Sequence, residues 1–443
     1  MRKVYLFLLL MTIVSLACQK EEHHIDYTKS DITSQNVLNE RVRTYSEALD
    51  VAEKLLVEFN GEMTRCDSPR KILADQGQCI TRSVTRNGES SEEPMMYIFN
   101  NEDNNGFTVI AADRTISPVI AITESGNYTY GEQTGNVAFD LYMEGAVAEL
   151  QGLLPPPTGP ITPILNRYYI TYDELREKAP LLTTKWGQWD IYNDYCPYLV
   201  ATGCGITAIA QIMAYHRYPA SFTTTYSSEY PYGGSTITLN WDMILNHIEA
   251  HDDIDTCNPY HYQISALFRE IGERAGCDYE NGDSSVVIEG VLTALRSFGY
   301  DSISAHTNIT HGLIYNDLDL NRPVFMSGFD GMHANRGGHA WVVDGYYDYK
   351  YGVETYVYGG IEVIPITPNP NIPDGYVLAE STVTHTQLLH INWGYSGNCN
   401  GWFNWGNYKL DEAEEYDSEG GYMYTSGPYS YDNTIISNID IYY

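Results

Sequence analysis

The stretch ATGCGITAIAQIMAYHRYP (residues 201–219) decides the fold, because a loop of small residues runs in it directly into an apolar helix. Its apolar residues recur at the spacing of one helix face: Ile206, Ile209, Ala210 and Met213. Pro219 follows the expected end of this helix. Cys204 therefore lies at or just before the helix N-terminus, where unpaired N–H groups and the helix dipole favour a thiolate, the nucleophilic form. The alternative is a buried, inert cysteine.

A nucleophilic cysteine needs a base, usually a histidine, and His339 in RGGHAWVVDGYY is the best-placed candidate. It follows two glycines that would let a substrate backbone approach closely. It also opens a strand-like apolar run, Trp341, Val342 and Val343. His339 comes 135 residues after Cys204, within the roughly 130–150 residues that separate cysteine and histidine in papain-like enzymes.

This spacing does not by itself single out His339, because three other histidines are available: His216, His333 and His390. His216 would lie about three turns along the helix from Cys204 and point away from the thiol. His333 stands in the same glycine-rich loop as His339 and remains a competitor for the role of base.

Two further segments complete the candidate site. In HINWGYSG, the amide of Asn392 could hold the far imidazole N–H, and the indole of Trp393 could shield that hydrogen bond from water. In PLLTTKWGQWD, Gln188 stands sixteen residues before Cys204. A side-chain amide together with the N–H of the nucleophile is a standard oxyanion hole. Each residue alone is more often a packing or turn residue, but the order Gln, Cys, His, Asn favours a catalytic set.

With these segments the sequence resembles the streptopain family of cysteine peptidases. The motifs that carry the resemblance are PLLTTKWGQ, TGCGITAIAQIMAYHRYP, GGHAWVVDG and HINWGYSG, and it covers most of the chain. It implies an α+β fold: a papain-like peptidase domain, with a helical lobe and an antiparallel sheet or barrel lobe, preceded by a small α+β inhibitory prodomain. It also implies that Cys204 is the nucleophile, His339 the general base and Gln188 the oxyanion glutamine, and that Asn392 and Trp393 are the Asn-Trp pair.

The sequence departs from this family at three places. Gly187 stands where the family commonly has asparagine, and Tyr395 and Ser396 stand where it often has tryptophan and glycine. The stretch from Tyr346 to about Leu388 is longer than the simplest members need. The chemistry is compatible with these changes, whereas the shape of the subsites and the gating of the loops stay open.

Composition narrows the class of protein further. The chain has 443 residues, enough for two or three domains, and 43% of them are hydrophobic. A formal net charge of −33 argues against nucleic-acid partners and favours solubility outside the cell. Neither CxxC nor HExxH spacing occurs, so we expect no metal and no cofactor.

The N-terminus is typical of an export signal. Arg2 and Lys3 precede an apolar run of 11 residues, which is too short to span a bilayer. Cys18, after a small-residue region, resembles the lipidated cysteine of bacterial lipoproteins. We expect residues 1–18 to be the signal peptide, 19–40 a flexible tether, and the protein an outer-membrane or cell-surface lipoprotein that meets the membrane only through its lipid. Ordinary signal cleavage, giving a secreted or periplasmic protein, is the alternative.

Residues 41–154 are expected to form the inhibitory prodomain. Thr44 and Glu47 form a capping box that predicts a helix start. Strand-like runs and a second helix follow, at residues 95–99, 107–111, 118–122 and about 139–154. GFTVIAADRTISPVIAITESG resembles the prodomain of the same family, and a plain surface or adhesive domain is the alternative.

A proline-rich linker, residues 155–165, separates this unit from the peptidase domain, residues 166–443, in which a helix is predicted from His261 to Ala275. Prodomain removal would require a cut near residues 151 to 180. Of the eight cysteines, six remain after Cys18 and Cys204 are set aside: Cys66, Cys79, Cys196, Cys257, Cys277 and Cys399. They allow 15 pairings, so the sequence does not fix disulfides.

The expected function is that of an exported cysteine endopeptidase, made as a zymogen that removes its own prodomain. Its partners are protein or peptide substrates and its own prodomain. Two alternatives stay open: a Cys-His acyl or amide transferase, and a catalytically silent binding lipoprotein at the cell surface.

Overall fold

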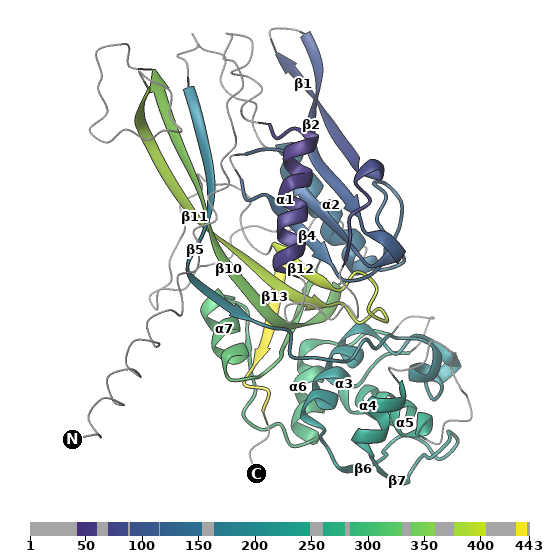
Figure 1. The fold of residues 1–443 in the computed structure, drawn as a ribbon. Helices are drawn as coiled ribbons and strands as arrows, with labels where there is room; N and C mark the ends of the chain where they lie inside the picture. Colours follow the sequence, from purple (N-terminus) through teal and green to yellow (C-terminus); the bar gives the residue numbers. More distant parts are fainter. Residues whose placement is uncertain are drawn as a thin grey trace, which may run out of the picture.

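The structure is a computed structural model. It describes residues 42–59, 70–86, 89–114, 116–152, 164–248, 260–279, 284–329, 338–358, 376–404 and 431–440. The expected signal peptide, tether and Cys18 lie outside these residues. Figure 1 shows three parts: an N-terminal unit at the upper right, a long ribbon of strands at the upper left and a helical lobe at the lower right. In the described part of the chain no helix is both long and apolar enough to cross a membrane.

The N-terminal unit is an antiparallel sheet with one helix on each face. Its elements are α1 (Tyr45–Glu58), β1 (Gln78–Arg86), β2 (Glu89–Asn100), β3 (Phe107–Ala111), β4 (Val119–Thr123) and α2 (Val137–Gly152). The predicted capping box is confirmed, because Thr44 and Glu47 cap each other's backbone at the start of α1. Alternate residues of the strands point to opposite faces. Tyr97 therefore packs with α1, whereas Met96 packs with α2.

The second half of the sheet is built around β10. Its strands are β5 (Ile164–Lys178), β8 (Ser304–His306), β9 (Val324–Phe329), β10 (Gly338–Tyr358), β11 (Tyr376–Asn392), β12 (Gly401–Asn404) and β13 (Tyr431–Ser437). β5 and β11 pair with β10 on opposite sides along most of its length. The described parts of the long stretch after Tyr346, up to residue 358 and from residue 376, thus belong to a three-stranded ribbon. β5 begins at Ile164, one residue before the last position of the expected linker.

One sheet runs through both halves of the molecule. The strand order is β1-β2-β3-β4-β12-β11-β10-β9-β13-β8, and with β5 the described strands number eleven. The joint is between β4 and β12, where Trp402 lies opposite Ile122 and Phe403 opposite Ala121. The N-terminal unit is therefore attached to the rest by backbone hydrogen bonds as well as by side chains.

The helical lobe covers one end of this sheet. It contains α3 (Cys204–His216), α4 (Trp241–Ile248), α5 (His261–Ala275) and α6 (Ile288–Ser297), with the short hairpin of β6 (Ser221–Thr223) and β7 (Thr236–Thr238). The remaining helix, α7 (His311–Asp319), packs on β9, β10 and β13. The helix predicted from His261 to Ala275 is confirmed.

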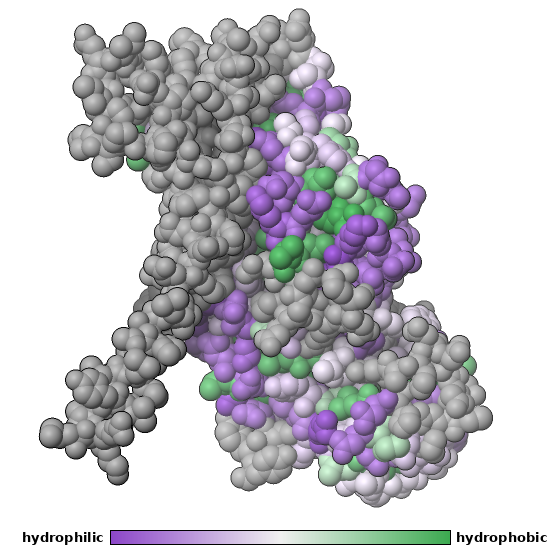
Figure 2. All heavy atoms as spheres, viewed as in Figure 1, coloured by the Kyte–Doolittle hydropathy of each residue, from purple (hydrophilic) through white to green (hydrophobic). Residues whose placement is uncertain are grey.

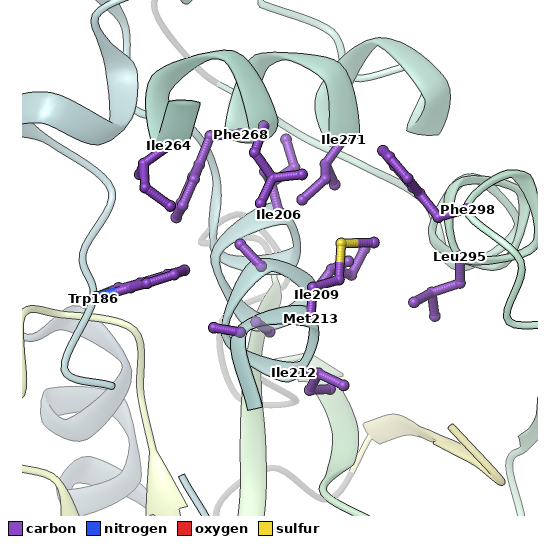
Figure 3. Close-up of a cluster of buried hydrophobic side chains, with 14 of the residues drawn as sticks. Trp186, Ile206, Ile209, Ile212, Met213, Ile264, Phe268, Ile271, Leu295 and Phe298 are labelled. Carbon is purple, nitrogen blue, oxygen red and sulfur yellow. The ribbon is translucent and has the colours of Figure 1, made fainter. Parts of the chain in front are cut away.

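The core of the helical lobe surrounds α3. Figure 3 shows the predicted apolar face of α3, which includes Ile206, Ile209 and Met213, directed toward α5, α6 and Trp186. Burying an aliphatic side chain of this size contributes about 1.5–3 kcal/mol. Because α3 packs against other elements on several sides, Cys204 at its N-terminus has a fixed position.

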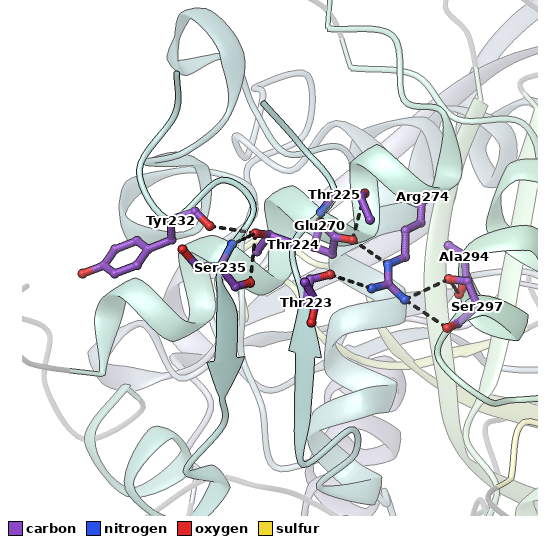
Figure 4. Close-up of polar contacts among 9 residues, drawn as sticks. All are labelled: Thr223, Thr224, Thr225, Tyr232, Ser235, Glu270, Arg274, Ala294 and Ser297. Atoms are coloured by element: carbon purple, nitrogen blue, oxygen red, sulfur yellow. Dashed lines mark hydrogen bonds and ion pairs between the residues drawn. The ribbon is translucent and has the colours of Figure 1, made fainter. Parts of the chain in front are cut away.

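A buried ion pair ties the hairpin to the helices of the lobe (Figure 4). Glu270, fully buried on α5, accepts hydrogen bonds from the backbone N–H and the hydroxyl of Thr225 and pairs with Arg274 Nε at 2.6 Å. Arg274 also donates to the carbonyl oxygens of Thr223 and Ser297. The carboxylate is thus fully compensated, as a buried charge requires.

On the face in Figure 2, hydrophilic side chains cover much of the described surface, with smaller hydrophobic areas between them.

Candidate active site

Cys204 is the first residue of α3, as the sequence predicts. The residue before it, Gly203, has a φ of 100°, in the region that side chains other than glycine rarely adopt. This glycine lets the loop turn directly into the helix, so that the half-buried thiol meets the helix N-terminus. Free N–H groups and the positive end of the helix dipole face the sulfur there.

The imidazole of His339, near the start of β10, is hydrogen-bonded to the thiol of Cys204. Burial alone would raise the pKa of Cys204, but the charge of His339, its hydrogen bond and the N–H groups of Ala340 and Gly205 outweigh it and lower that pKa. Burial would likewise lower the pKa of His339, but Cys204 and the Trp393 carbonyl raise it. Both shifts favour a thiolate beside an imidazolium.

The imidazole is oriented by the main chain rather than by the expected amide. His339 Nε2 lies 3.0 Å from the carbonyl oxygen of Trp393. The expectation that Asn392 holds the imidazole is therefore corrected, because its side chain is engaged elsewhere. The expected cover is present: the indole of Trp393 is fully buried, and its centroid lies 6.5 Å from that of the imidazole.

Asn392 instead joins the loops around the site through Gln211 of α3. Its Nδ2 donates to the Thr184 carbonyl at 2.8 Å and to Gln211 Oε1 at 3.0 Å, and its Oδ1 accepts from the Gly394 N–H. Gln211 Oε1 also accepts the N–H of Trp186 at 3.2 Å. Sequence reasoning did not find Gln211, although a glutamine on the apolar helix seven residues after Cys204 is a signal for it.

Gln188 lies on the same side of the site as Cys204. Its carbonyl oxygen accepts the N–H of Thr202, two residues before the thiol, at 3.0 Å. Its half-buried side chain is hydrogen-bonded to the hydroxyl of Tyr395. The ring centroid of Tyr395 in turn lies 5.3 Å from that of His339. The structure thus brings Cys204, His339, Gln188 and Trp393 to one place.

The departures from the family pattern are neighbours in space. The Ser396 N–H donates to the Trp186 carbonyl at 3.3 Å, and a Cβ added at Gly187 would collide with the Ser396 hydroxyl. Tyr395 meanwhile contacts the residue after Gly187. The loop that carries Trp393 and the loop that carries Gln188 therefore fit each other closely at these positions.

The competing histidines do not face the thiol where the structure describes them. His216 lies at the far end of α3, its Nδ1 is 3.4 Å from the Tyr300 hydroxyl, and burial lowers its pKa to about 4. His390 is buried against Asp344. His333 lies outside the described residues.

His390 belongs to a buried charged cluster at the joint between the two halves. Its Nδ1 lies 2.6 Å from Asp344 Oδ1, and its Nε2 lies 3.4 Å from Glu124 Oε1. All three side chains are at most 3% exposed. Burial would lower the pKa of His390, but the carboxylates of Asp344 and Glu124 raise it to about 9. Glu124 comes from the N-terminal unit, directly after β4.

The N-terminal unit also forms hydrogen bonds with the loop that follows Trp393. Ser125 donates a hydrogen bond to the Gly397 carbonyl, and Asn136 donates to the Asn398 carbonyl at 2.7 Å. Asn398 donates in return to the Thr134 carbonyl at 3.0 Å. The loop that orients the imidazole is thus held from outside by the N-terminal unit.

The described cysteines other than Cys204 are free thiols: Cys79, Cys196, Cys277 and Cys399. Burial raises the pKa of Cys196 to about 11 and that of Cys277 to about 12, so these thiols stay protonated near neutral pH. Cys66 and Cys257 lie outside the described residues. Cys204 is therefore the described cysteine whose environment lowers the thiol pKa.

Comparison with known proteins identifies both halves of the chain. Residues 186–403 match the Peptidase C10 family, and residues 36–144 match the Spi protease inhibitor family. Streptopain of Streptococcus pyogenes is 26% identical over 348 residues, covering 70% of this chain and 73% of streptopain. The thiol protease/hemagglutinin PrtT of Porphyromonas gingivalis is 24% identical over 70% of this chain, but over only 34% of its own length.

Among solved structures, a fragment of Prevotella intermedia prointerpain A aligns with a TM-score of 0.47 at 19% identity, covering 82% of this chain and 99% of that chain. From the family matches, the chain carries a Peptidase C10 domain, which is a cysteine-type peptidase domain, behind an inhibitor-like prodomain. The resemblance seen in the sequence is confirmed. The α+β fold class is confirmed by the helical lobe and the antiparallel sheet themselves.

Proposed function

We propose that this protein is an exported cysteine endopeptidase made as a zymogen, which hydrolyses peptide bonds through Cys204 and His339. The observation that carries the proposal is the contact between these two side chains, in which the thiol pKa is lowered and the imidazole pKa is raised. A thiolate paired with an imidazolium is the form that attacks a carbonyl and then protonates a leaving amine.

In the first half of the reaction the Cys204 thiolate attacks the scissile carbonyl carbon. Gln188 and the backbone N–H of Cys204 stabilise the oxyanion. The C–N bond breaks as His339 gives its proton to the leaving amine. The acyl group stays bound to Cys204 as a thioester, the acyl-enzyme. In the second half, neutral His339 takes a proton from water, and the resulting attack on the thioester releases the acid and restores the thiolate.

The N-terminal unit acts in this proposal as an intramolecular inhibitor. Its support is the pairing of β4 with β12, the Glu124–His390 contact and the hydrogen bonds to the loop after Trp393. We further propose that the enzyme removes this unit itself by cutting near residues 151 to 180. Export, and lipid attachment at Cys18, belong to the same proposal and rest on the sequence alone.

Active-site labelling tests the proposed function. Protein lacking residues 1–18 is first matured to completion with tagged wild-type enzyme that is then removed. It is next incubated in reducing buffer with a thiol-reactive peptide epoxide, and the modified residue is located by mass spectrometry. We expect the epoxide to label Cys204. Casein should be cleaved by the unlabelled protein and not by the labelled protein. In His339→Ala, Cys204 should be labelled far more slowly near pH 6. A Cys204 that resists the epoxide in a protein that leaves casein intact would favour the silent binding protein. Ligation to an added amine, without hydrolysis, would favour the transferase.

A further inference from the structure

Tyr395 lies at the meeting point of the candidate site, although family resemblance gives it no role. It follows Trp393 by two residues, and its half-buried ring lies 5.3 Å from the imidazole ring of His339, tilted by 35°. Its backbone is fixed as well, because its carbonyl oxygen accepts the N–H of Asn398 at 2.9 Å. The phenol is therefore held against the site by both its ring and its main chain.

The hydroxyl of Tyr395 contacts the side-chain amide of Gln188. Burial and, next, the nearby charge of Cys204 raise the pKa of Tyr395 to about 12, although the hydrogen bond with Gln188 lowers it. A neutral phenol oxygen can accept a hydrogen bond from an amide N–H. The phenol thus stays neutral through the working range of a cysteine peptidase and keeps an oxygen that accepts hydrogen bonds.

A primary amide carries two N–H groups, and only one is needed to stabilise an oxyanion. A glutamine on a half-buried loop has three side-chain torsions, so its amide samples many directions unless something fixes it. When one N–H is bound to the Tyr395 oxygen, the plane of the amide fixes the direction of the other. Preorganised donors of this kind stabilise the transition state without reorganising during the reaction.

We propose that Tyr395 is a positioning residue of the oxyanion hole, which fixes the Gln188 amide through its phenol oxygen. The neighbouring fit of Gly187 against Ser396 keeps the two loops close enough for this contact. The proposal rests on the proposed function, because an oxyanion forms only if Cys204 attacks a carbonyl. The proposal goes beyond the proposed function, because it gives a mechanistic role to Tyr395, a position where this chain departs from the family pattern.

The test compares two reagents that use Cys204 in different ways. A peptide aldehyde forms a tetrahedral adduct whose oxygen occupies the oxyanion hole, whereas iodoacetamide alkylates the thiolate without forming an oxyanion. The variants are Tyr395→Phe, Gln188→Ala and the double variant, with Tyr198→Phe as the control, because Tyr198 is 87% exposed. Each is matured to completion with tagged wild-type enzyme that is then removed.

We expect Tyr395→Phe to lower kcat and aldehyde affinity about 3- to 10-fold, the loss of one hydrogen bond, with KM and the alkylation rate changed less than about 2-fold. In the Gln188→Ala background the same change should have no further effect on kcat. An equal loss of kcat in both backgrounds, or alkylation slowed as much as catalysis, would overturn the positioning role. If wild-type protein neither binds the aldehyde nor reacts with iodoacetamide at Cys204, the proposed function fails, and the role of Tyr395 fails with it.

Discussion

Glu124 of the prodomain and His390 of the peptidase domain meet inside the joint between them, with 3.4 Å between Oε1 and Nε2 and both side chains at most 3% exposed. Asp344 contacts the other imidazole nitrogen, so one histidine is shared by a carboxylate from each side of the joint. This contact is made only while the prodomain is in place, and one prediction about maturation and one about stability depend on it.

Glu124→Gln should speed maturation. The substitution keeps the shape of the side chain but leaves the His390 charge without one of its partners, and losing a partner of a buried pair costs about 3–5 kcal/mol. We expect the half-time of prodomain removal, followed by gel electrophoresis in reducing buffer, to fall several-fold. Glu132→Gln is the control, because Glu132 is exposed on the prodomain. Equal half-times for both variants would mean that Glu124 does not hold the joint.

Stability of the precursor should depend on the charge of His390. The pKa of His390 is raised to about 9 from an ordinary value of 6.5, so its contribution is complete below about pH 6.5 and is lost as the pH rises through about 9. The difference corresponds to on the order of 3 kcal/mol. Urea unfolding of the Cys204→Ala precursor between pH 6 and 10 should show this loss. His390→Gln should remove most of the slope, and an unchanged slope would contradict the assignment.

Turnover should have a broad pH plateau. Because the pKa of Cys204 is lowered and that of His339 is raised, the thiolate–imidazolium pair persists over a wider range than the ordinary pKa values would give. We expect kcat/KM to fall at acid pH as the thiolate is protonated and at alkaline pH as the imidazolium loses its proton. A profile with a single rise near the ordinary pKa of a free thiol would show that the pair is not formed.

Gln188→Ala should lower kcat by about 10²–10³, the usual loss for one oxyanion donor. Cys204→Ala and His339→Ala should abolish turnover. The measurement is kcat on a fluorogenic peptide, with each protein matured by tagged wild-type enzyme that is then removed. Tyr198→Phe, at an exposed position of the peptidase domain, is the control. Unaltered turnover in Gln188→Ala would remove this residue from the mechanism.

Gln211→Met should destabilise the peptidase domain. It leaves the Trp186 N–H and the Asn392 amide without their shared partner, and each buried polar group left unsatisfied costs about 1–3 kcal/mol. Urea unfolding of the Cys204→Ala precursor measures the loss. A Gln151→Met variant, at an exposed position, should unfold like the parent. No change in Gln211→Met would mean that water or neighbouring groups replace the amide.

Local sequence patterns predicted the parts of the fold whose causes are local. The helix that begins at Cys204, the capping box of Thr44 with Glu47, and the buried strand after His339 each depend on residues within a few positions of one another. The nucleophile and the base could be predicted for a similar reason, because the residues directly around Cys204 and His339 form recognisable local motifs. Their meeting in space was implied by family resemblance.

The features that sequence patterns missed depend on distant partners. Glu124 and His390 are 266 residues apart in the chain, and each looks like an ordinary polar residue in its own segment. The pairing of β4 with β12 is equally invisible, because any strand edge has the same backbone groups. The Trp393 carbonyl took the role expected of the neighbouring Asn392 amide, since a main-chain oxygen leaves no mark in the sequence.

The central claim, that Cys204 makes this protein a self-maturing peptidase, is tested most directly by following the precursor itself. Wild-type protein and Cys204→Ala, both lacking residues 1–18, are incubated side by side in reducing buffer, with intact-mass measurement and a casein assay at each time point. We predict that only the wild type loses its prodomain by a cut near residues 151 to 180 and gains casein cleavage at the same rate. Equal cutting of both proteins, or no change and no casein cleavage in either, would contradict it.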